Sequence, residues 1–261
     1  MFRRFFLKQQ FDSDVMLSIG TSKSRAVHSK VSYDDIKNLP SIVQRYLVYC
    51  GVIDAPEIKN FELKFKTEMY KRNSSTAMRG CSVQYNQITE NQRYFFMTTK
   101  LMGLKVEVYH KYYADVAFMK VRLANLYNII DKSGGILSKA ESVTILNDRC
   151  CFAPASLIDS NISWEVIDEL QVLAKFNTGK YIVAARLIFN NQGQLINFIS
   201  DDRPALESNG QWSYVTWSTP IFEYIGINGR NIPSYGEAVY HYPQNDFVYG
   251  KFWLQNFAYN L

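Results

Sequence analysis

The chain has 261 residues, of which 47% are hydrophobic and 20% charged, which excludes a disordered chain and is typical of a globular protein with a real core. Tyr (18) and Phe (17) are abundant, and these residue types favour β-strands. The net charge of +5 is modest, and the sequence has no dense basic patch with interleaved aromatic residues, so we predict no nucleic-acid partner.

Residues 1–31 are predicted to form an N-terminal helix over 2–20, ended by Gly20, and a polar linker. The apolar run Phe5-Phe6-Leu7 stops at Lys8, which makes it too short for a signal peptide or a membrane-spanning helix. We therefore expect a cytoplasmic protein in which this helix packs on the domain. Because phenylalanines and basic residues interleave here, the alternative is a peripheral contact of this segment with a membrane surface.

Two signals predict short helices between residues 32 and 51. Ser32 and Asp35 have the spacing of a capping box, and Pro40 suits the first turn of a helix. The residues after Pro40 carry an apolar stripe, and Gly51 suits the end of that helix.

From residue 59 the hydrophobic period changes to two, and the alternation over 61–69 predicts a half-buried strand with one wet face. Further strands are predicted over 93–101, 104–113 and 116–126, separated by short turns. This spacing is typical of an antiparallel meander. Tyr109 and Tyr112 stand out on it; sheet packing is the usual role of such rings, and stacking on a ligand is the alternative.

Residues 134–158 are the one convincing helical stretch between two sets of strands. Apolar residues recur at three and four from Ile136 to Cys150 and predict one apolar face, with Glu141 and Asp148 on another. Pro154 is expected to end this helix and to open a short second one. A helix in this position predicts an internal plug inside a curved antiparallel sheet.

The polar run Asn147-Asp148-Arg149 lies within this helix among apolar residues. A structural salt bridge or cap is the interpretation we favour, because buried charges normally survive in pairs. The alternative is a polar contact at the floor of a pocket, since perturbed charged groups also gather at functional sites.

Strand-like runs resume over 162–167, 172–176, 181–189 and 195–200, with hairpin signals between the later ones. One more strand is predicted within 211–226, with Trp212 and Tyr214 on one side and Val215 and Trp217 on the other. The last strands are expected over 238–242 and 247–259. No repeat or low-complexity linker interrupts the pattern, so residues 32–261 are predicted to be a single domain.

The predicted fold class is therefore α+β, mainly β. It is a curved antiparallel sheet, or open half-barrel, wrapped around an internal helix and preceded by N-terminal helices.

Neither the cysteines nor the histidines form a chemical motif. Zinc spacings and a secreted disulfide framework are absent, so the four cysteines are predicted to be reduced thiols; a redox or soft-metal role for adjacent Cys150 and Cys151 is the alternative. The three histidines are isolated, and a Ser-His-Asp set is recognised by geometry, which a sequence does not show. We predict no metal and no cofactor, and the signal for an enzyme is weak.

Several ordered segments carry a family resemblance. They are Leu39-Pro40 with Val43-Gln44-Arg45-Tyr46-Leu47, Ala153-Pro154, Trp164-Glu165 with Asp168, Asp202-Arg203, Trp217-Ser218-Thr219-Pro220, Gly236-Glu237 and Tyr249-Gly250. Together they resemble a bacterial family known only as domain of unknown function 6544, over about residues 32–261. The resemblance implies no reaction, cofactor or catalytic residue. The order of helix, strands, plug and strands is also similar to the open half-barrels of lipoprotein carriers, an analogy of fold alone.

Three functional hypotheses follow, and the oligomeric state stays open. The first is a binding protein that holds an apolar or amphipathic, lipid-like molecule between sheet and plug. Its candidate ligand-binding residues are Asn147, Asp148, Arg149, Asp202, Arg203, Trp217, Tyr109 and Tyr112. The second is an enzyme that uses Asp148, Arg149, Asp202 and Arg203 in a common cleft. The third is a module that binds a partner or a membrane surface.

Overall fold

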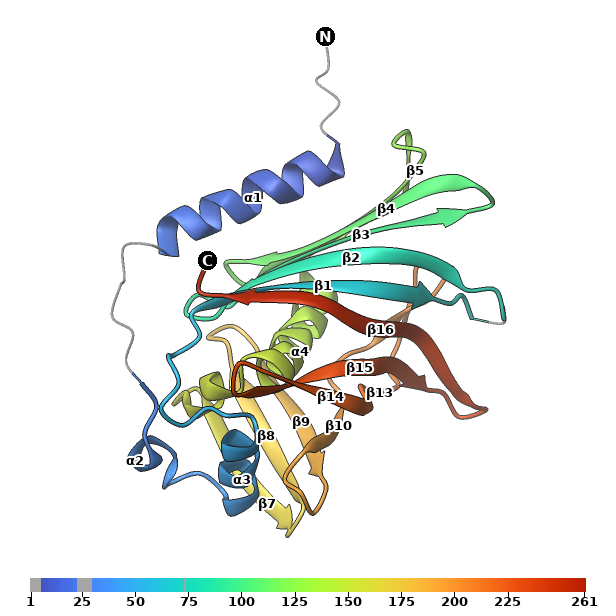
Figure 1. Ribbon diagram of the computed structural model, residues 1–261. Coiled ribbons are helices and arrows are strands. Elements are labelled where there is room, and N and C mark those ends of the chain that lie inside the picture. Colours follow the sequence, from blue (N-terminus) through green and yellow to red (C-terminus); the bar gives the residue numbers. More distant parts are fainter. Residues whose placement is uncertain (1–5, 23–29, 73) are drawn as a thin grey trace. The chain divides into compact units, whose positions relative to one another are not determined.

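The structure, a computed structural model, describes residues 6–22, 30–72 and 74–261 (Figure 1). Strands make up 52% and helices 20%, the sheet is mostly antiparallel, and it is not closed. The predicted fold class is thereby confirmed. The chain falls into two compact units: unit 1 holds Met1–Val27, Lys59–Ser138 and Trp253–Leu261, and unit 2 holds His28–Ile58 and Lys139–Phe252. The single domain predicted over 32–261 stays a prediction.

Unit 1 contains an antiparallel meander in the order β6-β5-β4-β3-β2-β1. The strands are β1 (Asn60–Met69), β2 (Met78–Gln87), β3 (Gln92–Leu101), β4 (Leu104–Tyr113), β5 (Val116–Leu123) and β6 (Tyr127–Ser133). The turns predicted at 102–103 and 114–115 are confirmed by positive φ at each of those residues. β6 was not predicted, because it is exposed along almost its whole length and has no apolar alternation.

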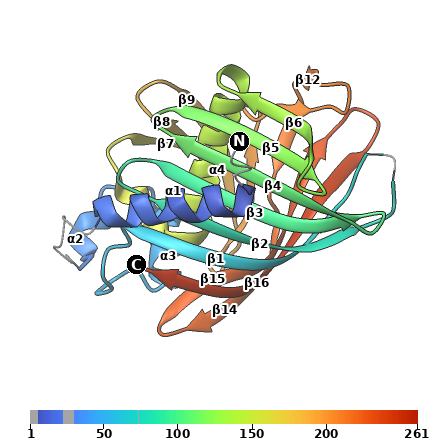
Figure 2. The ribbon, with the colours of Figure 1, turned by 90° about the horizontal axis from the view of Figure 1, so that it is seen from above.

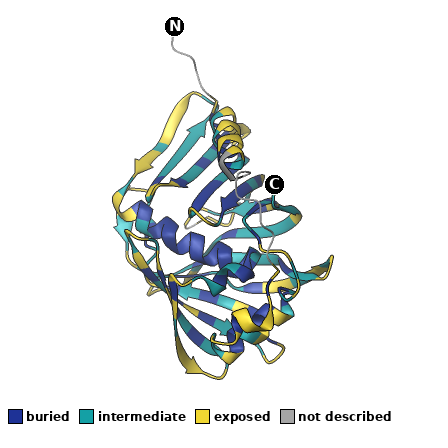
Figure 3. Cartoon of the chain, turned by 90° about the vertical axis from the view of Figure 1, so that its left-hand side faces the viewer, coloured by how far each residue is buried: buried dark blue, intermediate teal, exposed yellow. Residues whose placement is uncertain are grey.

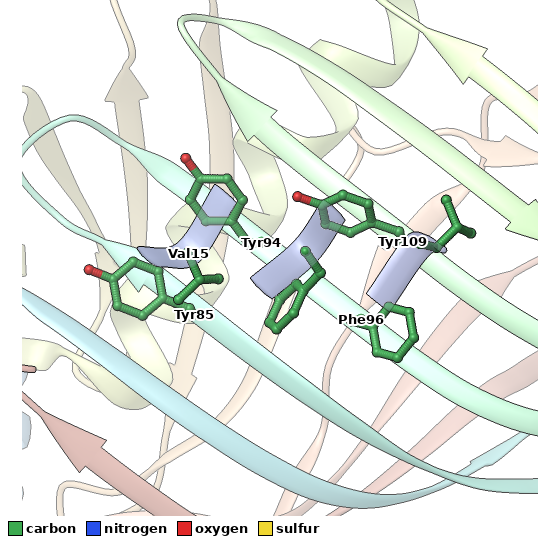
Figure 4. Close-up of a cluster of buried hydrophobic side chains, with 7 residues drawn as sticks. Val15, Tyr85, Tyr94, Phe96 and Tyr109 are labelled. Atoms are coloured by element: carbon green, nitrogen blue, oxygen red, sulfur yellow. The ribbon is translucent and has the colours of Figure 1, made fainter. Parts of the chain in front are cut away.

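Helix α1 (Leu7–Ser22) covers one face of this meander (Figure 2). Leu7, Phe11 and Val15 recur every four residues and are buried against Tyr85 and Tyr109, as Figure 4 shows for part of this cluster. The predicted helix over 2–20 is confirmed from residue 7 onward, but it does not end at Gly20, because α1 continues to Ser22. Its first predicted residues lie outside the described part of the chain. Most of the predicted polar linker also lies outside the described residues.

Unit 2 has the strand order β15-β13-β10-β9-β8-β7, with β14 paired to β15. These strands are β7 (Ile162–Asp168), β8 (Gln171–Asn177), β9 (Ile182–Phe189), β10 (Leu195–Ser200), β13 (Thr216–Ser218), β14 (Ile221–Ile227) and β15 (Arg230–His241). A separate pair is formed by β11 (Ala205–Leu206) and β12 (Trp212–Ser213), and the last strand is β16 (Asp246–Tyr259). The single strand predicted within 211–226 is wrong: β12, β13 and β14 divide that stretch.

The short helices predicted after residue 31 are α2 (Tyr33–Ile36) and α3 (Ser41–Tyr49). The Asp35 carboxylate accepts hydrogen bonds from the backbone N–H and the hydroxyl of Ser32, both at 2.7 Å, which confirms the capping interaction. Gly51 has φ of +67°, as a residue that ends a helix requires. There is no room for a side chain on it, because an added Cβ would lie 1.9 Å from the Gly229 carbonyl oxygen.

The central helix is α4 (Gly135–Phe152), followed by a 3₁₀ turn over Pro154–Ile158, as predicted. The single apolar face that the sequence predicts for this helix is wrong. Every residue from Ala140 to Cys151 is buried, the charged Glu141, Asp148 and Arg149 included (Figure 3). Because burial extends around the helix, its polar side chains must find partners inside the protein.

Candidate functional site

Arg203, which follows β10, is the centre of a buried polar network in unit 2. Its Nε donates to Thr144 Oγ1 of α4 at 2.9 Å, and its Nη1 donates to the hydroxyl of Tyr240 in β15. The guanidinium lies 4.5 Å from the centre of the Trp217 ring and 3.8 Å from Glu141 Oε1. One arginine thus joins α4, β13 and β15 within unit 2.

The surroundings of Arg203 keep it charged. Burial by itself lowers the pKa of the guanidinium, but Tyr240, Tyr249 and Glu141 outweigh that effect, and the pKa lies above its ordinary value. The Trp217 indole N–H donates to the Tyr249 hydroxyl at 3.1 Å, and the rings of Tyr240 and Tyr249 stack at 4.9 Å. The donors of Arg203 and Trp217 are directed at protein acceptors, so this network is suited to hold strands together.

Asp202 and Arg149, two further charged residues predicted from the sequence, pair with residues other than Arg203. Asp202 pairs with Lys139 at 2.6 Å and accepts from the Ala184 backbone N–H at 2.8 Å. Arg149 pairs with Asp159 at 2.9 Å, and its guanidinium lies 4.9 Å from the centre of the Phe176 ring. Arg149, Asp202 and Arg203 therefore pair with three different residues. The enzyme hypothesis required them to converge in one cleft.

Asn147 and Asp148 also lie on the buried part of α4. Asn147 Oδ1 accepts from the Thr219 hydroxyl at 2.6 Å, and the Asp148 residue is 4% exposed. The structure thus brings all six predicted residues between 147 and 217 into unit 2. Their contact with a ligand stays a prediction.

Tyr109 and Tyr112 lie in unit 1, three positions apart on β4, and therefore point to opposite faces. The Tyr109 hydroxyl donates to Asp14 Oδ2 of α1 at 2.6 Å, and the Tyr112 hydroxyl donates to Asp115 Oδ1 at 2.8 Å. Burial and the bond to Asp14 raise the pKa of Tyr109, so it stays a neutral donor. Both rings are buried in protein, and stacking on a ligand stays a prediction.

A Ser-His-Asp chain that sequence reasoning missed lies in unit 2. Ser218 Oγ is 2.7 Å from His241 Nε2, and His241 Nδ1 is 2.7 Å from Asp246 Oδ1, the order found in serine hydrolases. The exposures are the reverse of that arrangement: Ser218 is 1% exposed, whereas the Asp246 side chain is 66% exposed. A nucleophile must reach its substrate. We therefore assign these three hydrogen-bonded residues a structural role, in which they link β13, β15 and β16.

Unit 1 contains a pocket of about 500 Å³ that the sequence did not predict. It lies on the face of the meander that α1 also covers, because the strand registers align Val83, Phe96 and Tyr109 across that face. Its lining residues are Lys8, Lys64, Phe65, Cys81, Ser82, Val83, Phe96, Thr98, Lys105, Glu107 and Gln255. Val83 and Phe96 supply apolar side chains, and three lysines supply positive charge.

The three lysines of the pocket lie at its rim and form ion pairs there. Lys8 pairs with Asp12, Lys64 with Glu62 and Lys105 with Glu107, and each lysine side chain is about half exposed. Glu107 itself is 1% exposed, and its Oε2 has no hydrogen-bond partner among the described residues. A buried carboxylate oxygen without a partner is costly, and a donor on a ligand would satisfy it.

The sequence held one signal for this pocket. The alternation of β1 placed Lys64 and Glu62 on a wet face, but it did not show which strands supply the neighbouring surface. Strand pairing decides that, because it brings Lys64 beside Val83 and Val83 beside Phe96.

Three of the four cysteines are suited to packing, whereas Cys81 is exposed. Cys50, Cys150 and Cys151 are buried, and burial raises the pKa of Cys50 to about 12 and the pKa of both others above the usual range. A thiolate is thus disfavoured at each, although thiolates carry redox and metal chemistry. Within the described part of the chain, no group of three or more His, Cys, Asp and Glu side chains could hold a metal ion.

The fold defines an α+β protein with an open, mainly antiparallel sheet and a buried central helix. The chain belongs to a family of unknown function, DUF6544, whose model matches residues 29–252. This confirms the family resemblance seen in the sequence, and it leaves α1 outside the matched region. No curated protein matches the chain.

Solved structures of similar fold include the following two. One is a LolA superfamily protein from Nitrosomonas europaea, with 6% identity and a TM-score of 0.45, over 83% of this chain and 93% of that one. The other is a DUF1329 family protein from Desulfovibrio piger, with 10% identity and a TM-score of 0.43, over 84% and 91%. At this level of similarity neither indicates a ligand. Among the described helices, none has the length and apolar character to span a membrane.

Proposed function

We propose that the protein binds an amphipathic small molecule, with an apolar chain and an anionic head group, in the pocket of unit 1. The pocket carries this proposal: its volume of about 500 Å³ lies within the range of small-molecule sites, and it combines an apolar floor with three lysines. The site lies on the α1 side of the meander. This location differs from the one that the sequence suggested, which was between the sheet and the central helix.

The physical argument rests on the two kinds of surface. Val83 and Phe96 bury an alkyl chain, which is favourable in proportion to the apolar area removed from water. The Lys8–Asp12 and Lys64–Glu62 ion pairs at the rim are partly exposed and individually weak, so a ligand anion replaces a carboxylate partner there at small cost. Glu107 Oε2 accepts a hydrogen bond from a head group that also carries a hydroxyl or an ammonium.

Calorimetric titration with dodecanoate tests the proposal, with dodecanol as the uncharged ligand of equal chain length. Lys64→Glu is expected to weaken dodecanoate binding about fivefold and to change dodecanol binding little, since one exposed charge contributes about 1 kcal/mol. Thr98→Trp, which fills the pocket, is expected to abolish binding of both. Native mass spectrometry of the gently purified protein should show a co-purified amphiphile.

Lys175→Glu is the matched control, because Lys175 is also half exposed and paired with a carboxylate, but lies in unit 2. It should bind dodecanoate like the parent. Binding that survives Thr98→Trp, or that Lys175→Glu weakens as much as Lys64→Glu, would contradict the site.

A further inference from the structure

The modest net charge of the chain conceals an asymmetry between the two units. Unit 1 holds 18 Lys and Arg against 8 Asp and Glu, a net charge of +10. Unit 2 holds 11 against 16, a net charge of −5, and the two values give the +5 of the whole chain. A field of this kind attracts anionic partners to unit 1 in particular.

The topology of unit 1 concentrates part of this charge at one end of the meander. In an antiparallel meander alternate turns lie at the same end, so the β1–β2, β3–β4 and β5–β6 connections lie together. Figure 2 shows the first two of these connections at the same end of the meander. We call this end of unit 1 the turn end.

The turn end exposes large apolar side chains. Met102, at the tip of the β3–β4 hairpin, is 95% exposed, and Leu104 next to it is 51% exposed. In and after the β5–β6 turn, Leu126 is 54% and Tyr127 is 70% exposed. Single exposed apolar residues are ordinary, but a group of them at one end, among cations, is typical of an interaction site.

Met102 is also unfavourable for its own backbone. Leu101 pairs with Leu104, so Met102 and Gly103 form a two-residue turn, with φ of +51° and +82°. Asn, Asp and Gly suit such a turn, whereas methionine is strained there. A residue that is both strained and exposed to water points to a role outside folding.

Cationic side chains surround these apolar residues. Lys71, Arg72, Lys100 and Lys105 are exposed on the β1–β2 connection and the β3–β4 hairpin. The opposite end of the meander differs: the β2–β3 turn contains Glu90 and the β4–β5 turn contains Asp115. The β4–β5 turn also exposes Tyr113 and Val116, but it carries an aspartate and no lysine, so exposed cations and exposed apolar residues lie together at the turn end.

We propose that the turn end docks on an anionic lipid bilayer, with Met102 inserted among the lipids and the flanking lysines on their head groups. Apolar insertion combined with cationic contacts is how peripheral proteins hold such a surface, each lysine or arginine adding to the attraction. A nucleic acid would use the lysines but would not bury Met102. The inference goes beyond the proposed function and does not require it, although Lys105 belongs both to the turn end and to the pocket rim.

Co-sedimentation with vesicles tests the proposal, using the full chain. The parent should bind vesicles in which a third of the lipid is phosphatidylglycerol and should not bind pure phosphatidylcholine. Raised salt should weaken binding, because it screens the cations. Met102→Asp and Lys100→Glu are each expected to weaken binding about tenfold.

Met102→Asn separates docking from folding. Asparagine suits the turn, so this variant should be at least as stable as the parent in thermal unfolding while its vesicle binding falls. Ala114→Asn is its matched control, because Ala114 has φ of +49° in the hairpin turn at the opposite end. It should gain stability without any change in binding.

Two further controls place the contact. Leu17→Asp alters an α1 side chain that is 70% exposed, and Tyr214→Asp alters one in unit 2 that is 72% exposed. Neither should weaken vesicle binding. The proposal is overturned if the parent does not bind phosphatidylglycerol vesicles, or if Met102→Asn binds like the parent. It also fails if Leu17→Asp weakens vesicle binding more than Met102→Asp does, because that result would place the contact on α1. The proposal is likewise contradicted if Lys100→Glu weakens binding but Met102→Asp does not, and if a nucleic acid displaces the protein from the vesicles.

Discussion

At the scale of single residues, the polar run on α4 shows how ambiguous a buried charge is in a sequence. Arg149 is 2% exposed and contacts Asp159 and the Phe176 ring. Burial lowers the pKa of Arg149. Burial also raises the pKa of Asp159, but hydrogen bonds from the Asn161 backbone and Arg149 outweigh it, so that pKa lies below its ordinary value. The pair favours the salt-bridge interpretation for Arg149.

Asp159→Asn is expected to lower the free energy of unfolding by about 3 kcal/mol at pH 7, because it leaves Arg149 buried without its counter-charge. The folded-state pKa of Asp159 is depressed, so its stabilisation is present above its unfolded pKa and is lost as pH falls through the folded value. The difference between parent and variant should therefore shrink below about pH 4. Urea unfolding at several pH values measures it.

Glu165→Gln provides the comparison, because it removes an exposed ion pair, with Lys175 at 3.4 Å. A change below about 1 kcal/mol is expected there. Equal losses in the two variants, or a difference for Asp159→Asn that grows toward low pH, would show that Arg149 does not depend on Asp159.

At the scale of elements, α1 is attached to unit 1 through a narrow set of contacts. Phe11 lies 5.7 Å from the Phe96 ring and 5.8 Å from the Tyr109 ring, and Asp14 accepts hydrogen bonds from Tyr109 and Lys111. The family match begins at residue 29, after this helix. We therefore expect α1 to open at a lower free energy than the strands beneath it.

Phe11→Ala is expected to release α1 while the strands stay folded, since a buried phenylalanine contributes about 3 kcal/mol. Hydrogen exchange should accelerate over residues 7–22 and stay slow in β3 and β4. Met16→Ala, on a side chain that is 73% exposed, should leave exchange unchanged. If Phe11→Ala instead unfolds the strands of the meander, α1 is an integral part of its core.

At the scale of the whole molecule, the separation of charge between the units predicts where an anionic surface makes contact. Hydrogen exchange on phosphatidylglycerol vesicles should slow at the β1–β2, β3–β4 and β5–β6 connections of unit 1. Exchange in the strands of unit 2, with its net charge of −5, should not change. Protection confined to unit 2 would contradict the electrostatic argument.

Much of the fold was predictable because local patterns specify it. The alternation over 61–69, the paired turns at 102–103 and 114–115, and Pro154 after the central helix all depend on residues close in sequence. The exposed strand β6 and the divided stretch at 211–226 were missed because no local pattern specifies them. Their pairing depends on distant strands, and they carry no clear apolar period of their own.

The candidate site was less predictable. Asp202, Arg203 and Trp217 were identified as residues of interest, but their partners Lys139, Thr144 and Tyr249 come from other elements. The pocket was not foreseen at all, because β1 to β4 and α1 each supply only part of it.

The sequence by itself determined most of the strands and helices in their order, the presence of the central helix and the family, since period, turn chemistry and motif order are local properties. Only the tertiary structure decided which side chains share a surface. It gathered an apolar floor and three lysines into one pocket, placed Met102 among cations, and divided a net charge of +5 into +10 and −5. The reason is physical: strand register and turn alternation bring distant residues together, and neither is written in the composition.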